Sequence, residues 1–249
     1  MALEVLLDQL KTERGVHAET LMASAGILIG QSVQASLWEE AMQEGRDRVA
    51  GLQVVQCKGG STFFVGDPLN RQLVDGYASP WGLLSETARE EGSEILPQME
   101  ELLLDGIRRL GTLEFGKPQV PAAHAPLNLE FSAPIHLWSL IGPLCKECCS
   151  QPAEWPLLCG LLAVRALRLV KPHLDPALAF RLAMDAAIER IQTMQSTARR
   201  DGVADRPSWP MIVLRSPKGW TGPAALGDKK LAGFWRSHQD RKSTRLNSS

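Results

Sequence analysis

Apolar residues recur every three to four positions along most of the chain, which is the spacing of an amphipathic α-helix. The clearest case follows Asp175, where Leu178, Leu182 and Ile188 keep this spacing. Asp175 suits the N-cap, and Pro176 suits the first helical position. The same pattern predicts further helices over residues 2–11, 18–44, 79–92, 93–110, 133–144 and 152–170, the last of them buried on nearly all sides.

A different pattern interrupts the helices between residues 52 and 71. Two β-prone runs, LQVVQC and STFFVG, flank Lys-Gly-Gly, and this arrangement predicts a β-hairpin near residues 52–65. The stretch GDPLNR that follows predicts a turn, in which Asp67 caps what comes next. Near the end of the chain, residues 211–214 predict one short strand. The sequence therefore predicts a mainly α fold with one hairpin, in the α+β class.

Composition limits the classes of function. The chain has 249 residues, 44% hydrophobic and 22% charged, which suits one large globular domain or two modest ones. The net charge of −1 predicts neither nucleic-acid binding nor attraction to an anionic membrane. The longest apolar stretch, LMASAGILIG, is shorter than the roughly 20 residues that span a bilayer. Glu4 and Asp8 stand where a signal peptide carries basic residues, so we expect a cytoplasmic protein.

The cysteines leave two interpretations open. Five are present, and the odd number favours free thiols in a reducing compartment. The stretch CKECC contains Cys145, Cys148 and Cys149, but structural zinc needs four ligands and neither His136 nor His173 falls at finger spacing. Buried or incidental thiols are therefore the preferred interpretation, with zinc as the alternative. The histidines considered as metal ligands, none with a Glu or His partner at metal spacing, are His17, His124, His136 and His173.

Residues 189–239 carry much more specific motifs. A helix with a basic last turn leads into Arg-Pro-Ser-Trp-Pro, then a strand, then Pro-Lys-Gly-Trp-Thr-Gly-Pro, and finally Trp-Arg-Ser-His-Gln. This segment resembles phosphoketolase, the thiamine-diphosphate enzyme that cleaves ketose phosphates with inorganic phosphate. The resemblance implies a fragment of a thiamine-diphosphate-binding α/β domain. Its implied substrates are xylulose 5-phosphate and fructose 6-phosphate, and its implied products are acetyl phosphate and an aldose phosphate.

The same resemblance implies roles for four residues. Lys218 would bring a positive charge to a cofactor diphosphate or a substrate phosphate. Gly219 and Gly222 would allow the backbone to approach the cofactor closely. His238 would exchange protons with the intermediate. The residues alone favour a different interpretation, in which Lys218 is a solvated surface charge and His238 is a structural side chain.

Important parts of the family pattern are missing from this sequence. The resemblance implies thiamine diphosphate and Mg²⁺, which the family holds through Gly-Asp-Gly followed by Asn. Neither Gly66-Asp-Pro nor Gly227-Asp-Lys matches that motif. The second thiamine domain, which supplies an activating glutamate, has no counterpart. We therefore expect that this chain does not bind the cofactor, is inactive, and is poorly ordered in its phosphoketolase-like part.

The chain divides on this basis into three predicted regions. Residues 1–188 form a helical domain that resembles small bacterial helical proteins of unknown function, a resemblance that supplies no activity. Residues 189–239 form the phosphoketolase-like fragment. Residues 240–249, DRKSTRLNSS, resemble the translation of a common sequencing-library adapter and are predicted to be disordered. Two hypotheses follow, an inactive truncated or chimeric phosphoketolase-family chain, or a non-catalytic helical domain that binds a partner or ligand. Neither predicts an oligomeric state.

Overall fold

The structure is a computed structural model in which the chain forms two units, Met1–Asp205 and Arg206–Ser249. The residues that it describes are 1–56, 62–75, 78–127, 133–192, 225–226 and 229–230. In the second unit these are two short strands, β3 (Ala225–Leu226) and β4 (Lys229–Lys230), which pair antiparallel. The strand predicted at 211–214 lies outside the described residues.

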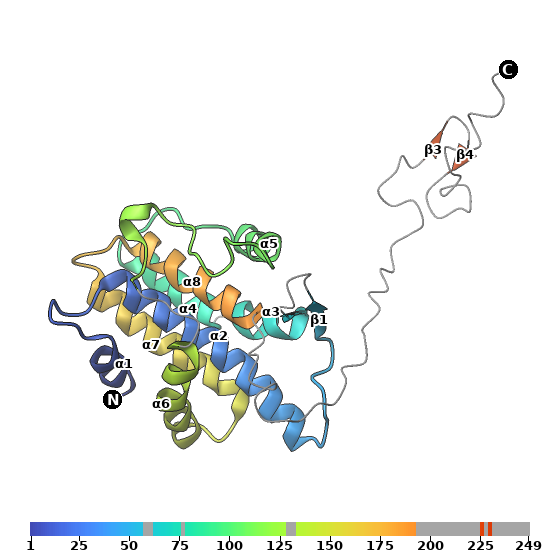
Figure 1. Ribbon diagram of the computed structural model, residues 1–249, viewed down its shortest axis with the longest axis horizontal. Helices are drawn as coiled ribbons and strands as arrows, with labels where there is room; N and C mark the ends of the chain where they lie inside the picture. Colours follow the sequence, from blue (N-terminus) through green and yellow to red (C-terminus); the bar gives the residue numbers. More distant parts are fainter. Residues whose placement is uncertain (57–61, 76–77, 128–132, 193–224, 227–228, 231–249) are drawn as a thin grey trace. The chain divides into compact units, whose positions relative to one another are not determined.

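Helices make up most of the first unit (Figure 1), so the prediction of a mainly helical fold is confirmed. The α-helices over the described residues are α1 (Ala2–Leu10), α2 (Ala18–Gln43), α3 (Asp67–Val74), α4 (Pro80–Glu90), α5 (Met99–Arg109), α6 (Ala133–Cys148), α7 (Trp155–Val170) and α8 (Pro176–Gln192). Two short 3-10 helices, Ala122–His124 and Pro152–Glu154, lie in the connections. No helix in this described part is both long and apolar enough to cross a lipid bilayer.

Helix α2 is the central element of the first unit. Its residues between Thr20 and Leu37 are buried almost without interruption, as expected of a helix that is apolar all round. Its most extensive contacts are with α8 and then with α7. Figure 1 shows α2, in blue, running beside α8, in orange, and α7, in yellow.

Two glycines on α2 set its distance from α8. A Cβ atom at Gly26 would lie 2.0 Å from the carbonyl oxygen of Ala183, and one at Gly30 would lie 2.5 Å from that of Ala187. Any side chain at these positions would therefore force the helices apart. Because Gly26 faces Ala183 and Gly30 faces Ala187, the two helices run parallel.

Helix α8 is fixed at both ends by side chains. The Asp175 carboxylate accepts hydrogen bonds of 2.9 and 3.1 Å from two main-chain N–H groups of the first turn, which confirms the predicted N-cap. At the other end, the Gln34 side-chain amide donates to two of the last carbonyls, at 3.1 and 2.9 Å. The helix continues without a break past Ile188, and Glu189–Gln192 are all buried. The boundary predicted at residue 188 thus falls within one buried helix, and the three-region division stays a prediction.

The hairpin predicted near residues 52–65 is present. Strand β1 (Gln53–Gln56) pairs antiparallel with β2 (Thr62–Val65), and Val55 faces Phe63 across the pair. Phe63 is buried and contacts the edge of the Phe115 ring, with ring centroids 4.9 Å apart. The hairpin is therefore attached to the helical unit through an aromatic side chain.

The turn predicted at 66–71 is wrong, because this stretch begins α3. Leu69 and Leu73, four residues apart, are almost completely buried in the core. This burial stabilises α3, which the local sequence does not predict. Asp67 does not cap the helix. The N-cap is Gly66, and no side chain there makes a capping hydrogen bond.

Two other predicted helices have different bounds. The helix expected from Ser93 begins only at Met99, since Pro97 disfavours helical backbone in the residue before it. Helix α6 continues to Cys148 instead of ending at residue 144. Helix α7 is exposed along one side, at Leu161 and Leu169, so its predicted burial on nearly all sides is wrong.

Candidate functional site

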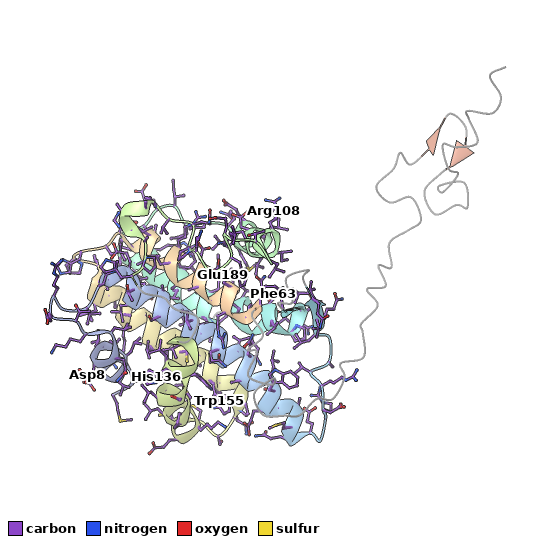
Figure 2. The ribbon with its side chains drawn as sticks, viewed as in Figure 1. Asp8, Phe63, Arg108, His136, Trp155 and Glu189 are labelled. Atoms are coloured by element: carbon purple, nitrogen blue, oxygen red, sulfur yellow. The ribbon has the colours of Figure 1, made fainter. Side chains whose placement is uncertain are left out.

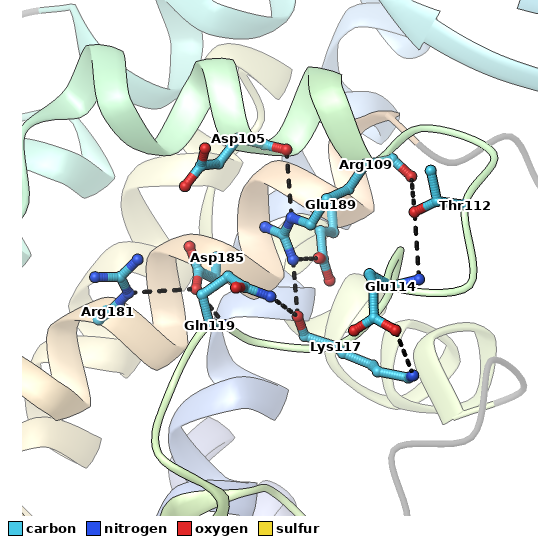
Figure 3. A network of polar contacts seen from close by, with 9 residues as sticks. All are labelled: Asp105, Arg109, Thr112, Glu114, Lys117, Gln119, Arg181, Asp185 and Glu189. Carbon is cyan, nitrogen blue, oxygen red and sulfur yellow. Dashed lines mark hydrogen bonds and ion pairs between the residues drawn. The ribbon is translucent and has the colours of Figure 1, made fainter.

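The residues that the resemblance assigns to an active site are Lys218, Gly219, Gly222 and His238. All four lie outside the described residues, so their roles stay predictions. The described part contains instead a cluster of charged side chains between α5, α8 and the proline-rich loop that follows α5 (Figure 3). We call this cluster the carboxylate centre and define it by Arg109, Arg181, Asp185 and Glu189.

The two carboxylates of the centre come from one face of α8. Asp185 and Glu189 are four residues apart, so their side chains stack on the same side of the helix. Both are buried, with 1% and 8% of their side-chain surfaces exposed. Figure 2 places Glu189 among the interior side chains, whereas Arg108 on α5 lies at the periphery.

Arg109 connects Glu189 to the proline-rich loop. Its Nη1 atom donates to Glu189 Oε1 at 2.6 Å and to the main-chain oxygen of Lys117 at 2.7 Å. The main-chain N–H of Gly116 also hydrogen-bonds to Glu189. Glu189 and Arg109 together therefore hold two successive residues of the loop by their backbone.

Asp185 holds the same loop two residues further on. Its Oδ2 atom accepts a hydrogen bond of 3.0 Å from the main-chain N–H of Gln119 and lies 3.7 Å from Arg181 Nε. Its Oδ1 atom is buried and has no hydrogen-bond partner among the described residues. An oxygen buried in this way favours the protonated carboxyl over the carboxylate.

The surroundings raise the pKa of both carboxyls. Burial raises the pKa of Glu189 from 4.5 to about 7; the charge of Arg109 opposes this rise, and that of Asp185 adds to it. Burial also raises the pKa of Asp185, against the Gln119 N–H and the charges of Arg181 and Arg109. A carboxyl with a pKa near 7 suits proton transfer. However, neither Asp185 nor Glu189 lines the nearby hollow of about 650 Å³ that borders the loop.

A second polar cluster holds the far end of the loop. Glu19 contacts two histidines, with His124 Nδ1 at 2.9 Å from Oε1 and His17 Nε2 at 3.2 Å from Oε2. The sequence showed no Glu at metal spacing from these histidines, and it did not predict this contact of Glu19 with both of them. The signal available in the sequence was the short spacing of His17 and Glu19, whereas His124 lies far away along the chain.

Neither cluster fits a metal site. In the part of the chain that the structure describes, no three His, Cys, Asp or Glu residues are arranged to hold a metal ion. Cys145 and Cys159 lie buried with their thiols in hydrogen-bonding contact, and this contact together with burial raises the pKa of Cys159. The interpretation of these two cysteines as buried free thiols agrees with that environment.

Comparison with known proteins finds similarity over the C-terminal part of the chain. A family model described as "XFP N-terminal domain" matches residues 171–247. "Probable phosphoketolase 1" of Nostoc sp. is 54% identical over 68 residues, which cover 26% of this chain and 8% of that protein. "Probable phosphoketolase" of Rhodopseudomonas palustris is 52% identical over 68 residues, covering 26% of this chain and 9% of that protein. No solved structure matches the chain.

These matches show that the C-terminal segment resembles phosphoketolases. The chain spans less than a tenth of the length of the curated relatives it matches. The matched range begins before α8, so this helix lies both in the phosphoketolase-like range and in the helical core. The range also reaches into residues 240–249, whose origin stays a prediction.

Proposed function

We propose that this chain has no phosphoketolase activity of its own and that its helical unit is a non-catalytic binding module. The observation that supports this proposal is the position of α8. The helix lies in the phosphoketolase-like range, yet Asp185 and Glu189 are buried and paired with Arg181 and Arg109. Side chains engaged in this way hold a loop in place and are not available to a substrate.

The family chemistry would fall to the segment beyond α8. There, Lys218 would contact a phosphate group, Gly219 and Gly222 would allow close approach, and His238 would exchange protons with a xylulose 5-phosphate or fructose 6-phosphate substrate. Thiamine diphosphate, when bound, supplies the electron sink for such a cleavage. The described acidic residues do not fit its magnesium site, because the buried carboxylates already have arginine partners. We therefore derive no catalytic step for this chain.

A test for acetyl phosphate decides the enzymatic part of the proposal. The purified chain is incubated with xylulose 5-phosphate, inorganic phosphate, thiamine diphosphate and Mg²⁺, beside a full-length phosphoketolase as positive control. We expect no acetyl phosphate from this chain. Acetyl phosphate that disappears in the Lys218→Ala variant would overturn the proposal.

We also propose a cytoplasmic, truncated or chimeric origin for the chain. The motifs of residues 189–239 and the adapter-like residues 240–249 support this origin. Long sequencing reads across the coding region test it directly. One uninterrupted gene in the source genome that encodes the same 249 residues would contradict it.

A further inference from the structure

Four of the five cysteines belong to α6, to α7 or to the turn that joins these helices. All four are free thiols, but they differ in exposure. Cys148 is exposed and Cys149 is half-buried, whereas Cys145 and Cys159 are only 4% and 1% exposed. The two buried cysteines lie on different helices and contact each other through their thiols.

The turn between α6 and α7 sets this pairing. At the turn, the Nε1 atom of Trp155 donates to the main-chain oxygen of Cys149 at 3.2 Å. Cys145 lies about one helical turn before Cys149, and Cys159 lies about one turn after Trp155. The two matched contacts mean that α6 and α7 run antiparallel here, so that Cys145 faces Cys159.

Packing from three helices holds the pair in place. Trp155, labelled in Figure 2, is buried at the start of α7, and the centroid of its ring lies 6.4 Å from that of Trp138 on α6. The Lys146 ammonium lies 5.2 Å from the centroid of the Trp155 ring. On α2, the hydroxyl of the fully buried Ser32 is in hydrogen-bonding contact with Cys159. The contact between the two thiols is therefore part of the core.

The two thiols differ in reactivity. The hydrogen bond from Cys159 lowers the pKa of Cys145, although burial opposes this change. The same contact and burial raise the pKa of Cys159. Because the thiolate is the form that attacks an oxidant, Cys145 is the more reactive of the two. Cys145 also keeps a little exposed surface, which a small oxidant reaches more easily than a bulky one.

We propose that Cys145 and Cys159 are an oxidation site, at which a small hydroperoxide such as hydrogen peroxide converts the two thiols into a disulfide between α6 and α7. The sulfur of Cys145 attacks one peroxide oxygen, the O–O bond breaks, and a sulfenic acid and water form. The sulfur of Cys159 then attacks that of Cys145. The S–O bond breaks, and a second water leaves with the Cys159 proton. The two thiols give up two electrons, which reduce one peroxide to two waters.

The bond requires little change in the surrounding structure. The sulfurs of a disulfide lie about 2.05 Å apart, and two thiols already in contact need only a small approach to reach this separation. In a reducing compartment such a bond forms transiently, in response to an oxidant. This inference goes beyond the proposed binding role and does not depend on it or on whether the chain is an enzyme.

The first experiment counts thiols in the full chain. The reduced chain is treated with a slight excess of hydrogen peroxide, and the remaining thiols are alkylated in urea and counted by mass spectrometry. The reduced chain carries five thiols, and we expect three after oxidation, because two are lost to the disulfide. Dithiothreitol should restore all five. A chain that still carries five thiols after peroxide treatment would overturn the proposal.

Two variants of the full chain identify the cysteines that react. The double variant Cys148→Ser, Cys149→Ser is the matched control, and it should lose two thiols at the rate of the unchanged chain. In Cys159→Ser the hydroxyl keeps a donor beside Cys145, but no disulfide can form. Oxidation of this variant should stop at a sulfenic acid on Cys145, which dimedone traps. Loss of the disulfide in the double variant, or a dimedone adduct on Cys148 alone, would contradict the proposal.

The folded packing is tested without any substitution. Urea-unfolded chain does not hold the two thiols in contact, so its disulfide should form much more slowly than that of the folded chain. The oxidised chain should in turn unfold at a higher urea concentration than the reduced chain, because the cross-link restricts the unfolded state. Equal rates of oxidation in the folded and unfolded chains would refute the role of the contact, as would an oxidised chain that unfolds at a lower urea concentration. The acetyl phosphate test is independent of these results.

Discussion

Glu189 makes the stability of the helical unit depend on pH in an unusual direction. Its pKa is about 7 in the folded chain against 4.5 as the ordinary value, mainly because the carboxyl is buried. Between these values the folded chain holds a proton that the unfolded chain has released. The stability that this proton gives is fully present below pH 4.5 and is lost as the pH rises through 7. At ~1.36 kcal/mol for each pH unit, the loss is about 3 kcal/mol.

The substitution that isolates this effect is Glu189→Gln. The amide keeps an oxygen that can accept from Arg109, but it does not titrate. The free energy of unfolding is measured by urea denaturation, followed by circular dichroism, at intervals from pH 4 to pH 8. The unchanged chain should lose about 3 kcal/mol relative to the variant across this range, most steeply between pH 5 and pH 7.

An exposed glutamate provides the control. Glu86 lies on the outer side of α4, and the Glu86→Gln variant should follow the pH dependence of the unchanged chain. Parallel curves for the unchanged chain and Glu189→Gln would refute the reasoning. The reasoning would also be refuted if the free energy of unfolding of the unchanged chain rose relative to that of the variant as the pH increases. Either result would mean that Arg109 keeps Glu189 charged throughout the range.

Two further predictions concern helix packing. Gly26→Ala should lower the free energy of unfolding by about 3 kcal/mol or more, because its Cβ would lie 2.0 Å from the Ala183 oxygen. Gly45→Ala is the control, since a Cβ there would meet no atom within 4 Å. It should lower the free energy of unfolding by only ~1 kcal/mol, which is the cost of placing alanine in a left-handed backbone conformation. Denaturation in urea compares the two, and equal losses would contradict the close approach of α2 and α8. A chain ended after Ile188 should be less stable by at least about 2 kcal/mol than one ended after Asp205, because it lacks the buried last turn of α8. Equal thermal stability of these two chains would support the boundary at residue 188.

The local sequence was a good guide wherever a signal lay within one element. Asp175 followed by proline predicts a capped helix start, and the cap is present because it needs only the first turn of α8. The Gly-Gly stretch between two β-prone runs predicts the hairpin for the same reason. Where a short element depends on packing against distant residues, the local sequence predicted the wrong structure, a turn at 66–71 in place of α3. Leu69 and Leu73 make α3 a helix only because the core is there to bury them.

Neither the Arg109–Glu189 ion pair of the carboxylate centre nor the Glu19–His124 contact could be predicted from the sequence. Arg109 and Glu189 are 80 positions apart, and Glu19 and His124 are 105 positions apart. No spacing within one helix or turn therefore predicts either contact. The sequence alone determined the helical character of the chain, the hairpin, and the likeness of its C-terminal segment to phosphoketolases. The tertiary structure decided that α8 is a core helix and that its carboxylates hold the proline-rich loop that follows α5. The reason is that helix caps and turns are fixed by neighbours along the chain. Burial and ion pairing depend instead on which distant residues the packing of α2 against α8 brings together.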